Sequence, residues 1–182
     1  PSWRQRIAIM EAQRQQHVII GFEPGLGKTF IPVWLYQLLA EQRLAENQGK
    51  GRMLYIGPKI VMSELPNRIR PGSVQGIAGH SYYVSDDLAP TVGVITDGLD
   101  AAEIEERMNA EVVFCPYTML NVVKDDIAIS DRLAAHRHKT TREPFTLLVA
   151  DECHKIKGNG DWTERIRHII HHGLQEFLAE ET

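Results

Sequence analysis

The chain has 182 residues, 43% hydrophobic and 24% charged, which is long enough for one globular domain with a buried core. Its 20 Lys and Arg residues against 24 Asp and Glu residues give a net charge of −4, so any nucleic-acid contact requires a local basic patch or a second domain. No apolar run approaches the roughly 20 residues of a membrane span, and no secretory leader is present. We therefore expect an intracellular protein, cytoplasmic or nuclear, without a membrane partner.

Short apolar runs alternate with amphipathic segments along the chain. The apolar runs predict strands over 17–22, 52–58, 91–97, 110–116 and 145–152, with a weaker candidate over 74–79. Helical patterns lie over 3–15, 29–46, 63–70, 100–108, 125–135 and 162–171, and the segment 136–144 predicts a loop. Runs rich in Val, Ile and Leu are typical of parallel strands buried on both faces. The alternation predicts an α/β fold, a mostly parallel sheet with helices on both faces.

The segment GFEPGLGKTF, residues 21–30, follows the first predicted strand and precedes a predicted helix. This is the context of a phosphate-binding (Walker A) loop, in which small residues let backbone N–H groups turn toward an anion. Gly25 and Gly27 supply that freedom, Lys28 is placed to reach the terminal phosphates, and the Thr29 hydroxyl to hold Mg²⁺. The alternative is a glycine-rich turn that binds nothing.

The segment LLVADECHKIKG, residues 147–158, supplies the second half of the predicted site. An apolar strand that ends in Asp151 and Glu152 places both acids at the carboxyl edge of the sheet, where open α/β sheets bind ligands. Asp151 is predicted to complete the Mg²⁺ coordination, and Glu152 to orient or deprotonate the attacking water. We interpret His154 as a residue that couples this site to a neighbouring domain, although a plain surface position also fits.

Taken in order, these motifs resemble superfamily 2 helicases and, within them, the Swi/Snf-like DNA translocases. The matching segments are WRQ at 3–5, GLGKT at 25–29, LYIGPKIVMSEL at 54–65, VVFCPYTML at 112–120 and the DEAH-like box DECHKIKG at 151–158. Helicase-type loops do not require glycine at the first loop position, where this chain has Phe22. The box also occurs as D-E-C-H in RNA-sensing and Dicer-type helicases, and related boxes occur in restriction-enzyme motor subunits, so those readings stay open.

The resemblance implies a single RecA-like lobe over 1–182, with the second lobe of the motor absent. It implies an ATP and Mg²⁺ site with catalytic roles for Lys28, Asp151 and Glu152. The implied nucleotide contacts are Gln5 at the adenine and the loop residues Gly25, Leu26, Gly27, Lys28 and Thr29. The implied nucleic-acid contacts lie at two strand-end loops, Pro58 and Lys59 in one and Pro116, Tyr117 and Thr118 in the other.

The predicted function is the ATP-binding lobe of a nucleic-acid-dependent ATPase whose polymer is duplex DNA and whose isolated lobe turns over slowly or not at all. The alternatives are an RNA or restriction-type helicase lobe, a non-catalytic nucleotide-binding interaction module and, least supported, a small-molecule P-loop kinase. His168, His171 and His172 have no metal-ligand partner at a suitable spacing, so we predict no metal there. Cys115 and Cys153 match no zinc or disulfide spacing and are predicted to be reduced, packed thiols.

Overall fold

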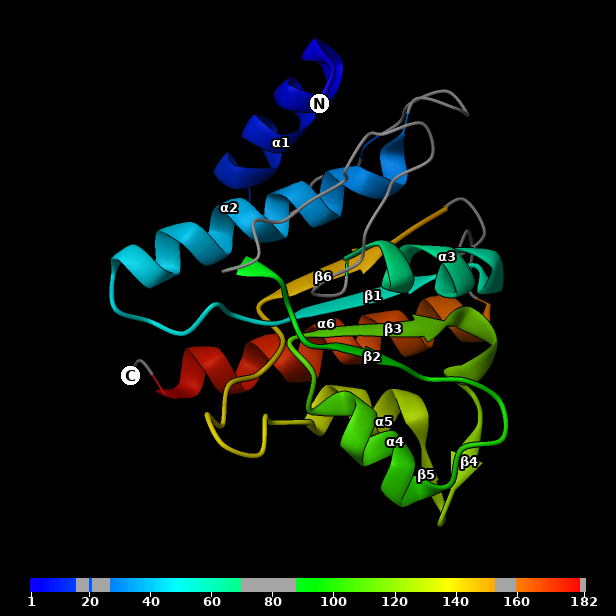
Figure 1. Ribbon diagram of the computed structural model, residues 1–182. Helices are drawn as coiled ribbons and strands as arrows, with labels where there is room; N and C mark the ends of the chain where they lie inside the picture. Colours follow the sequence, from blue (N-terminus) through cyan, green and yellow to red (C-terminus); the bar gives the residue numbers. More distant parts are fainter. Residues whose placement is uncertain (16–19, 21–26, 70–87, 153–159, 181–182) are drawn as a thin grey trace.

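The computed structural model describes residues 1–15, 20, 27–69, 88–152 and 160–180 (Figure 1). Within them, four strands form one parallel sheet in the order β2-β3-β1-β6. Their bounds are β1 Met53–Gly57, β2 Val92–Val94, β3 Val112–Pro116 and β6 Leu147–Ala150. These strands lie inside four of the predicted runs, and the all-parallel pairing confirms the predicted fold class. The other two predicted strands, 17–22 and 74–79, lie outside the described residues apart from Ile20.

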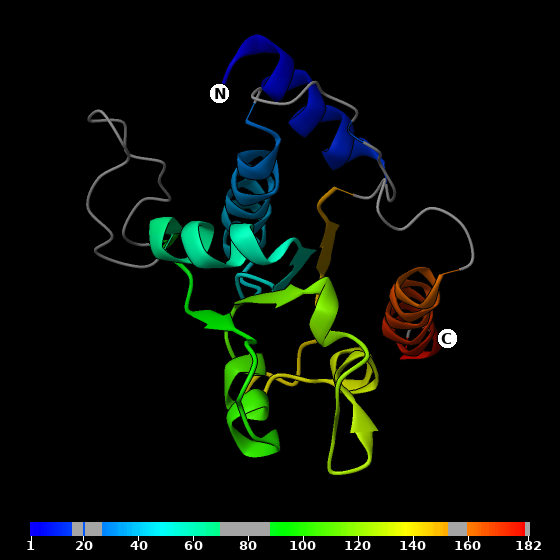
Figure 2. The same cartoon turned by 90° about the vertical axis from the view of Figure 1, so that its right-hand side faces the viewer.

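Helices cover both faces of the sheet (Figures 1 and 2). Their bounds are α1 Trp3–Arg14, α2 Ile31–Ala45, α3 Lys59–Ile69, α4 Ala101–Met108, α5 Ile129–Ala135 and α6 Asp161–Glu180. The residues of β1 alternate between two cores, because successive side chains of a strand point to opposite faces. Leu54 and Ile56 pack with α4, α5 and α6, whereas Met53 and Tyr55 pack with α2 and α3.

Helix α1 lies on α2 rather than on the sheet. Ala8 and Ile9 of α1 pack against Ile31 and Leu35 of α2 in a third apolar cluster. The helix begins with a capping box in which the Ser2 side chain and the Gln5 side chain satisfy each other's backbone N–H groups. This arrangement fixes the first turn of α1, and therefore Gln5, relative to α2.

The predicted helix over 125–135 is wrong in its first half. Residues Val123–Lys124 (β4) and Ile127–Ala128 (β5) form a two-stranded antiparallel hairpin, and α5 begins at Ile129. Asp125 and Asp126 both have positive φ, at 48° and 62°, which is the backbone of a tight hairpin turn and is tolerated by Asp. The sequence suggested a helix start because Asp is also common at helix N-termini.

Two other helices differ from prediction in their bounds. Helix α3 begins at Lys59 instead of residue 63, directly after Pro58, whose carbonyl oxygen accepts a hydrogen bond of 3.0 Å from the Val61 N–H. Helix α6 continues to Glu180, well beyond the predicted end at 171. The loop predicted over 136–144 is confirmed, since it contains turns and irregular backbone only. Its Glu143 pairs with Arg43 of α2 at 2.8 Å, which ties this loop to the far helix layer.

Candidate nucleotide-binding site

The described part of the predicted phosphate loop lies at the start of a helix. Lys28, Thr29 and Phe30 form a single 3₁₀ turn, η1 (Lys28–Phe30), that runs directly into α2. Gly27 precedes it with φ 68° and ψ 34°, a left-handed conformation that glycine adopts at little cost. Lys28 and Thr29 therefore stand where the free N–H groups of a helix N-terminus favour an anion. Gly25 and Leu26 lie outside the described residues.

Gln5 of α1 reaches this loop from outside the sheet. Its Nε2 atom donates a long hydrogen bond of 3.5 Å to the carbonyl oxygen of Gly27. The approach is close enough that a Cβ atom at position 27 would lie 2.7 Å from Gln5 Nε2. The structure thus brings the residue predicted to read the adenine against the loop predicted to bind the phosphates, across 22 positions of sequence.

The acidic pair follows strand β6 at the carboxyl edge of the sheet. The Asp151 N–H donates a hydrogen bond of 2.8 Å to the carbonyl oxygen of Ile56 in β1. Asp151 therefore continues the sheet pairing beyond the strand. The Asp151 Oδ1 atom accepts a hydrogen bond of 2.9 Å from the backbone N–H of Glu152. Glu152 itself has φ 52°, a left-handed conformation that costs a non-glycine residue about 1 kcal/mol or more. Such strain is found at functional sites, where the surroundings enforce it.

Tyr55 connects the acidic pair to the phosphate loop. Its hydroxyl donates a hydrogen bond of 2.8 Å to Asp151 Oδ2, and the Thr29 side chain lies near the same phenol. Burial, followed by the negative charge of Asp151, raises the pKa of Tyr55 far above its ordinary value, which Thr29 offsets in part, so the hydroxyl keeps its proton and acts as a donor. Thr29 and Asp151, the two predicted Mg²⁺ ligands, therefore both lie near one side chain.

The two loops predicted to contact nucleic acid leave neighbouring strands at the same edge. Gly57 at the end of β1 is paired with Pro116 at the end of β3, so Pro58 and Tyr117 follow side by side. The Tyr117 side chain is only 3% exposed and turns inward. Its hydroxyl donates a hydrogen bond of 2.6 Å to the backbone carbonyl oxygen of Asp151. Thr118 is exposed. The Tyr117 side chain therefore contacts the acidic strand end and is not exposed for the predicted polymer contact.

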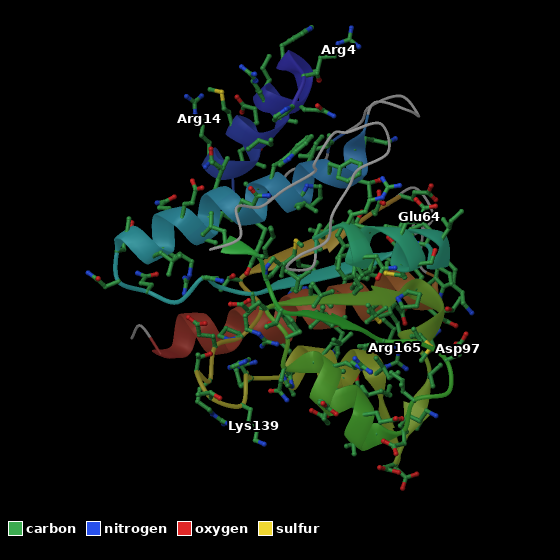
Figure 3. All side chains as sticks on the ribbon, viewed as in Figure 1. Arg4, Arg14, Glu64, Asp97, Lys139 and Arg165 are labelled. Carbon is green, nitrogen blue, oxygen red and sulfur yellow. The ribbon has the colours of Figure 1, made fainter. Side chains whose placement is uncertain are left out.

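Lys59, the predicted phosphate-gripping cation, is paired with an acid. Its Nζ lies 2.5 Å from Oδ2 of Asp97, and both side chains are exposed, at 72% and 64%. Figure 3 labels Asp97 and Glu64 at the edge of the molecule where β1 and β3 end. Beside this edge, a cavity of about 270 Å³ separates the loop from α3, bounded by residues that include Thr29, Phe30 and Leu65.

Two residues of this edge escaped prediction from the sequence. Tyr55 lies within a predicted apolar strand, and its only distinguishing feature is a hydroxyl inside that run. Asp97 stands at the end of a predicted strand, a position similar to that of Asp151, but no motif surrounds it. His154 lies outside the described residues. Of the two cysteines, Cys115 is free and fully buried, and burial raises the pKa of its thiol, while Cys153 is outside the described residues.

The described residues fit a nucleotide with its magnesium ion. The hydroxyl of Thr29 and the carboxylate of Asp151 are oxygen ligands of the kind Mg²⁺ prefers, and both lie near Tyr55 at the sheet edge. Gly27 keeps the loop free of a side chain where Gln5 approaches. Elsewhere in the described part of the chain, His, Cys, Asp and Glu residues form no group of three or more that suits a metal ion.

A parallel sheet with a predicted lysine–threonine phosphate loop and an Asp-Glu pair at its carboxyl edge is typical of the nucleotide-binding domains of P-loop ATPases, a class that includes the helicase-type ATPases and generally uses ATP and Mg²⁺. The chain matches the family described as type III restriction enzyme, res subunit (ResIII), over residues 2–178, and it belongs to that family. Searches of curated proteins and of solved structures gave no match. Among the described residues, no helix is both long enough and apolar enough to cross a membrane.

Proposed function

We propose that this chain is the ATP-binding lobe of a nucleic-acid-dependent motor and, more narrowly, of a translocase on double-stranded DNA. The observation that carries the nucleotide site is the hydrogen bond between the Tyr55 hydroxyl and Asp151, beside Lys28 and Thr29 at the start of α2. The family named for a restriction enzyme and the resemblance to Swi/Snf-like translocases both support DNA as the polymer.

Each residue has a defined task in this proposal. Lys28 binds the terminal phosphates as a point charge, and Gln5 contacts the adenine from α1. Thr29 and Asp151 hold Mg²⁺, which neutralises charge that develops on the phosphates. Glu152 orients the attacking water and accepts its proton, and its left-handed backbone turns it away from the strand direction set by β6.

Polymer contact is proposed at the strand ends of β1 and β3. The carboxyl ends of these neighbouring strands are held in register by the Gly57–Pro116 pair, so Pro58, Lys59 and Thr118 form one edge. Lys59 and backbone N–H groups suit phosphate contacts that do not depend on base sequence. A net charge of −4 for the whole chain is compatible with such a local contact.

We further propose that residues 1–182 are a single lobe that works with a second RecA-like lobe in a longer parent chain, where His154 couples the two. Arginine side chains from a partner lobe stabilise the charge on the γ-phosphate and change rates by about 10³-fold or more in related motors. The isolated chain should therefore bind Mg-nucleotide weakly and hydrolyse it slowly or not at all.

The test is ATP hydrolysis by this chain and by a longer chain that includes a second lobe, each without polymer and with duplex DNA, single-stranded DNA or duplex RNA. Lys28→Ala and Glu152→Gln serve as inactive controls. Stimulation of the longer chain by duplex DNA supports the translocase, whereas stimulation only by RNA reassigns it to the RNA helicases. Nucleotide binding without stimulation by any polymer would leave the nucleotide site standing and remove the reason to call the chain a motor, and a Lys28→Ala variant of the longer chain with unaltered activity would favour a non-catalytic interaction module.

A further inference from the structure

Tyr55 lies where the acidic pair and the phosphate loop come together. It is in the middle of β1 and fully buried, and its hydroxyl donates a hydrogen bond of 2.8 Å to Asp151 Oδ2, with the Thr29 side chain near the same phenol. Tyr55 and Asp151 are 96 positions apart in the sequence. A phenol in this position ties the orientation of the Asp151 carboxylate to strand β1.

The surroundings of Tyr55 leave its ring little freedom. The ring packs 5.3 Å from the Phe114 ring, centroid to centroid, within the core that also contains Met62 and Leu65. Gly57 permits the close approach of Tyr55 to Asp151, because a Cβ atom at position 57 would lie 3.2 Å from Tyr55 Cε1 and 3.3 Å from Asp151 Cβ. A buried side chain held on several sides has a fixed hydroxyl position.

The hydrogen bonds to Asp151 leave room for a cation. An ionised carboxylate has about four lone-pair sites, and here Tyr55 uses one on Oδ2 while the Glu152 N–H uses one on Oδ1. One site on each oxygen therefore remains for Mg²⁺ or for a water that it carries. Outer-sphere hydrogen bonds of this kind orient a metal-binding carboxylate, and their removal typically lowers metal affinity about 10- to 100-fold.

We propose that Tyr55 is a positioning residue for the magnesium site, which fixes the Asp151 carboxylate relative to Thr29 before nucleotide binds. The inference rests on the proposed nucleotide site and adds a residue to it. Tyr55 acts through Asp151 and touches no reacting atom. Because β1 leads directly to Pro58 and Lys59, the same side chain fixes the metal ligands relative to the strand that carries the predicted polymer contact.

The experiment compares the affinity of the chain for a fluorescent ADP analogue in Mg²⁺ and in EDTA, for the wild type and for Tyr55→Phe. The ratio of the two dissociation constants measures the contribution of the metal. We expect Tyr55→Phe to reduce this ratio about tenfold while affinity in EDTA stays the same. A merely structural tyrosine would lower both affinities together or neither, so the ratio separates the two roles.

Tyr36→Phe is the matched control. Tyr36 is also buried, at 2% exposed, but its hydroxyl donates a hydrogen bond of 3.4 Å to the carbonyl oxygen of Gly51, away from the proposed site. Asp151→Asn gives the ratio expected when the metal ligand itself is impaired. Thermal unfolding without ligand shows that each variant is folded. If Tyr55→Phe does not fold, Gly57→Ala displaces Tyr55 from Asp151 without removing a polar group and should reduce the ratio in the same direction.

The outcomes separate this inference from the function on which it rests. A wild-type chain that binds no nucleotide overturns the proposed site and Tyr55 with it. A wild type with Mg²⁺-dependent binding and a Tyr55→Phe variant with the same ratio leaves the site standing and removes the role of Tyr55. A higher ratio in Tyr55→Phe also contradicts the proposal, because it would mean that the hydroxyl competes with the metal for Oδ2.

Discussion

The Tyr117 hydroxyl donates a hydrogen bond of 2.6 Å to the backbone carbonyl oxygen of Asp151. Tyr117 begins the loop after β3, and Asp151 directly follows strand β6, which lies on the other side of β1. The Tyr117 ring also stacks on Trp162 of α6, with centroids 5.3 Å apart and planes at 21°. One side chain therefore links the loop predicted to face the polymer, the acidic pair and the C-terminal helix.

We predict that Tyr117→Phe lowers the free energy of unfolding by about 1 kcal/mol, because it leaves a carbonyl oxygen at the sheet edge without its donor and keeps the ring. Urea unfolding of the two proteins measures this difference. Tyr36→Phe is the comparison, and its longer hydrogen bond of 3.4 Å predicts a smaller loss. Equal losses for both variants would mean that the Tyr117 hydrogen bond is no stronger than the longer one made by Tyr36.

The Lys59–Asp97 pair gives a prediction about polymer binding. Asp97 lies 2.5 Å from the Lys59 ammonium and places a negative charge beside the proposed phosphate contact. Asp97→Asn should therefore strengthen binding to a labelled DNA duplex by about 1 kcal/mol, or about fivefold, at low salt, and by less at high salt. Fluorescence anisotropy at two salt concentrations measures it.

Glu46→Gln makes the same change in net charge at the C-terminal end of α2, which lies at the opposite end of the molecule from the strand ends of β1 and β3 (Figure 1). If it strengthens binding as much as Asp97→Asn does, the effect comes from net charge and not from the proposed edge. Both side chains of the Lys59–Asp97 pair are exposed, so neither Asp97→Asn nor Lys59→Ala should change stability by more than about 0.5 kcal/mol.

The sequence was enough to predict the four described strands of the parallel sheet, because parallel strands buried on both faces leave unbroken apolar runs such as Met53–Gly57. It also located Asp151 and Glu152 at a strand end, where chemistry in such sheets is found. The order of the strands in the sheet could not be predicted from the sequence, because β1 pairs with β3 and β6 and not with β2, the next described strand along the chain. Tyr55 was missed for a related reason: its hydroxyl matters only through a partner 96 positions away.

The short hairpin shows the other limit of sequence reasoning. Asp125 and Asp126 suit both a helix start and a turn with positive φ, and local propensity does not choose between them. The choice is made by contacts outside the segment. The Arg132 guanidinium of α5 donates a hydrogen bond of 2.7 Å to the carbonyl oxygen of Lys124, which holds the hairpin against α5. The same guanidinium forms an ion pair of 3.1 Å with Glu105 of α4.

Gly27→Ala should weaken nucleotide binding while the chain stays folded. Gly27 has φ 68°, which costs an alanine about 1 kcal/mol or more, and the new Cβ would lie 2.7 Å from Gln5 Nε2. The Gln5 side chain must turn away to relieve this contact, which separates its amide from Lys28 and Thr29. Titration with the fluorescent ADP analogue measures the loss, and thermal unfolding verifies the fold. Gly98→Ala, at φ 92° with open space around it, is the control for backbone strain alone.

His136 predicts how stability depends on pH. Its side chain is buried against Phe145, and burial, followed by the positive charge of Arg52, lowers its pKa from 6.5 to about 4, although Glu105 lies 3.4 Å from Nδ1. The folded chain therefore keeps His136 neutral where the unfolded chain takes up a proton. Stability from this residue is fully present above pH 6.5 and is lost as the pH falls from about 6.5 toward 4.

We expect the wild type to lose about 1 to 2 kcal/mol of unfolding free energy between pH 7 and pH 5 through this residue. His136→Gln keeps a donor for Glu105 and does not titrate, so its loss over the same range should be smaller by that amount. Urea unfolding of both proteins at the two pH values gives the double difference, in which the contributions of all other groups cancel. A double difference of zero would mean that His136 is protonated equally in both states, and one of opposite sign would mean that Glu105 outweighs burial and holds the proton on the folded chain.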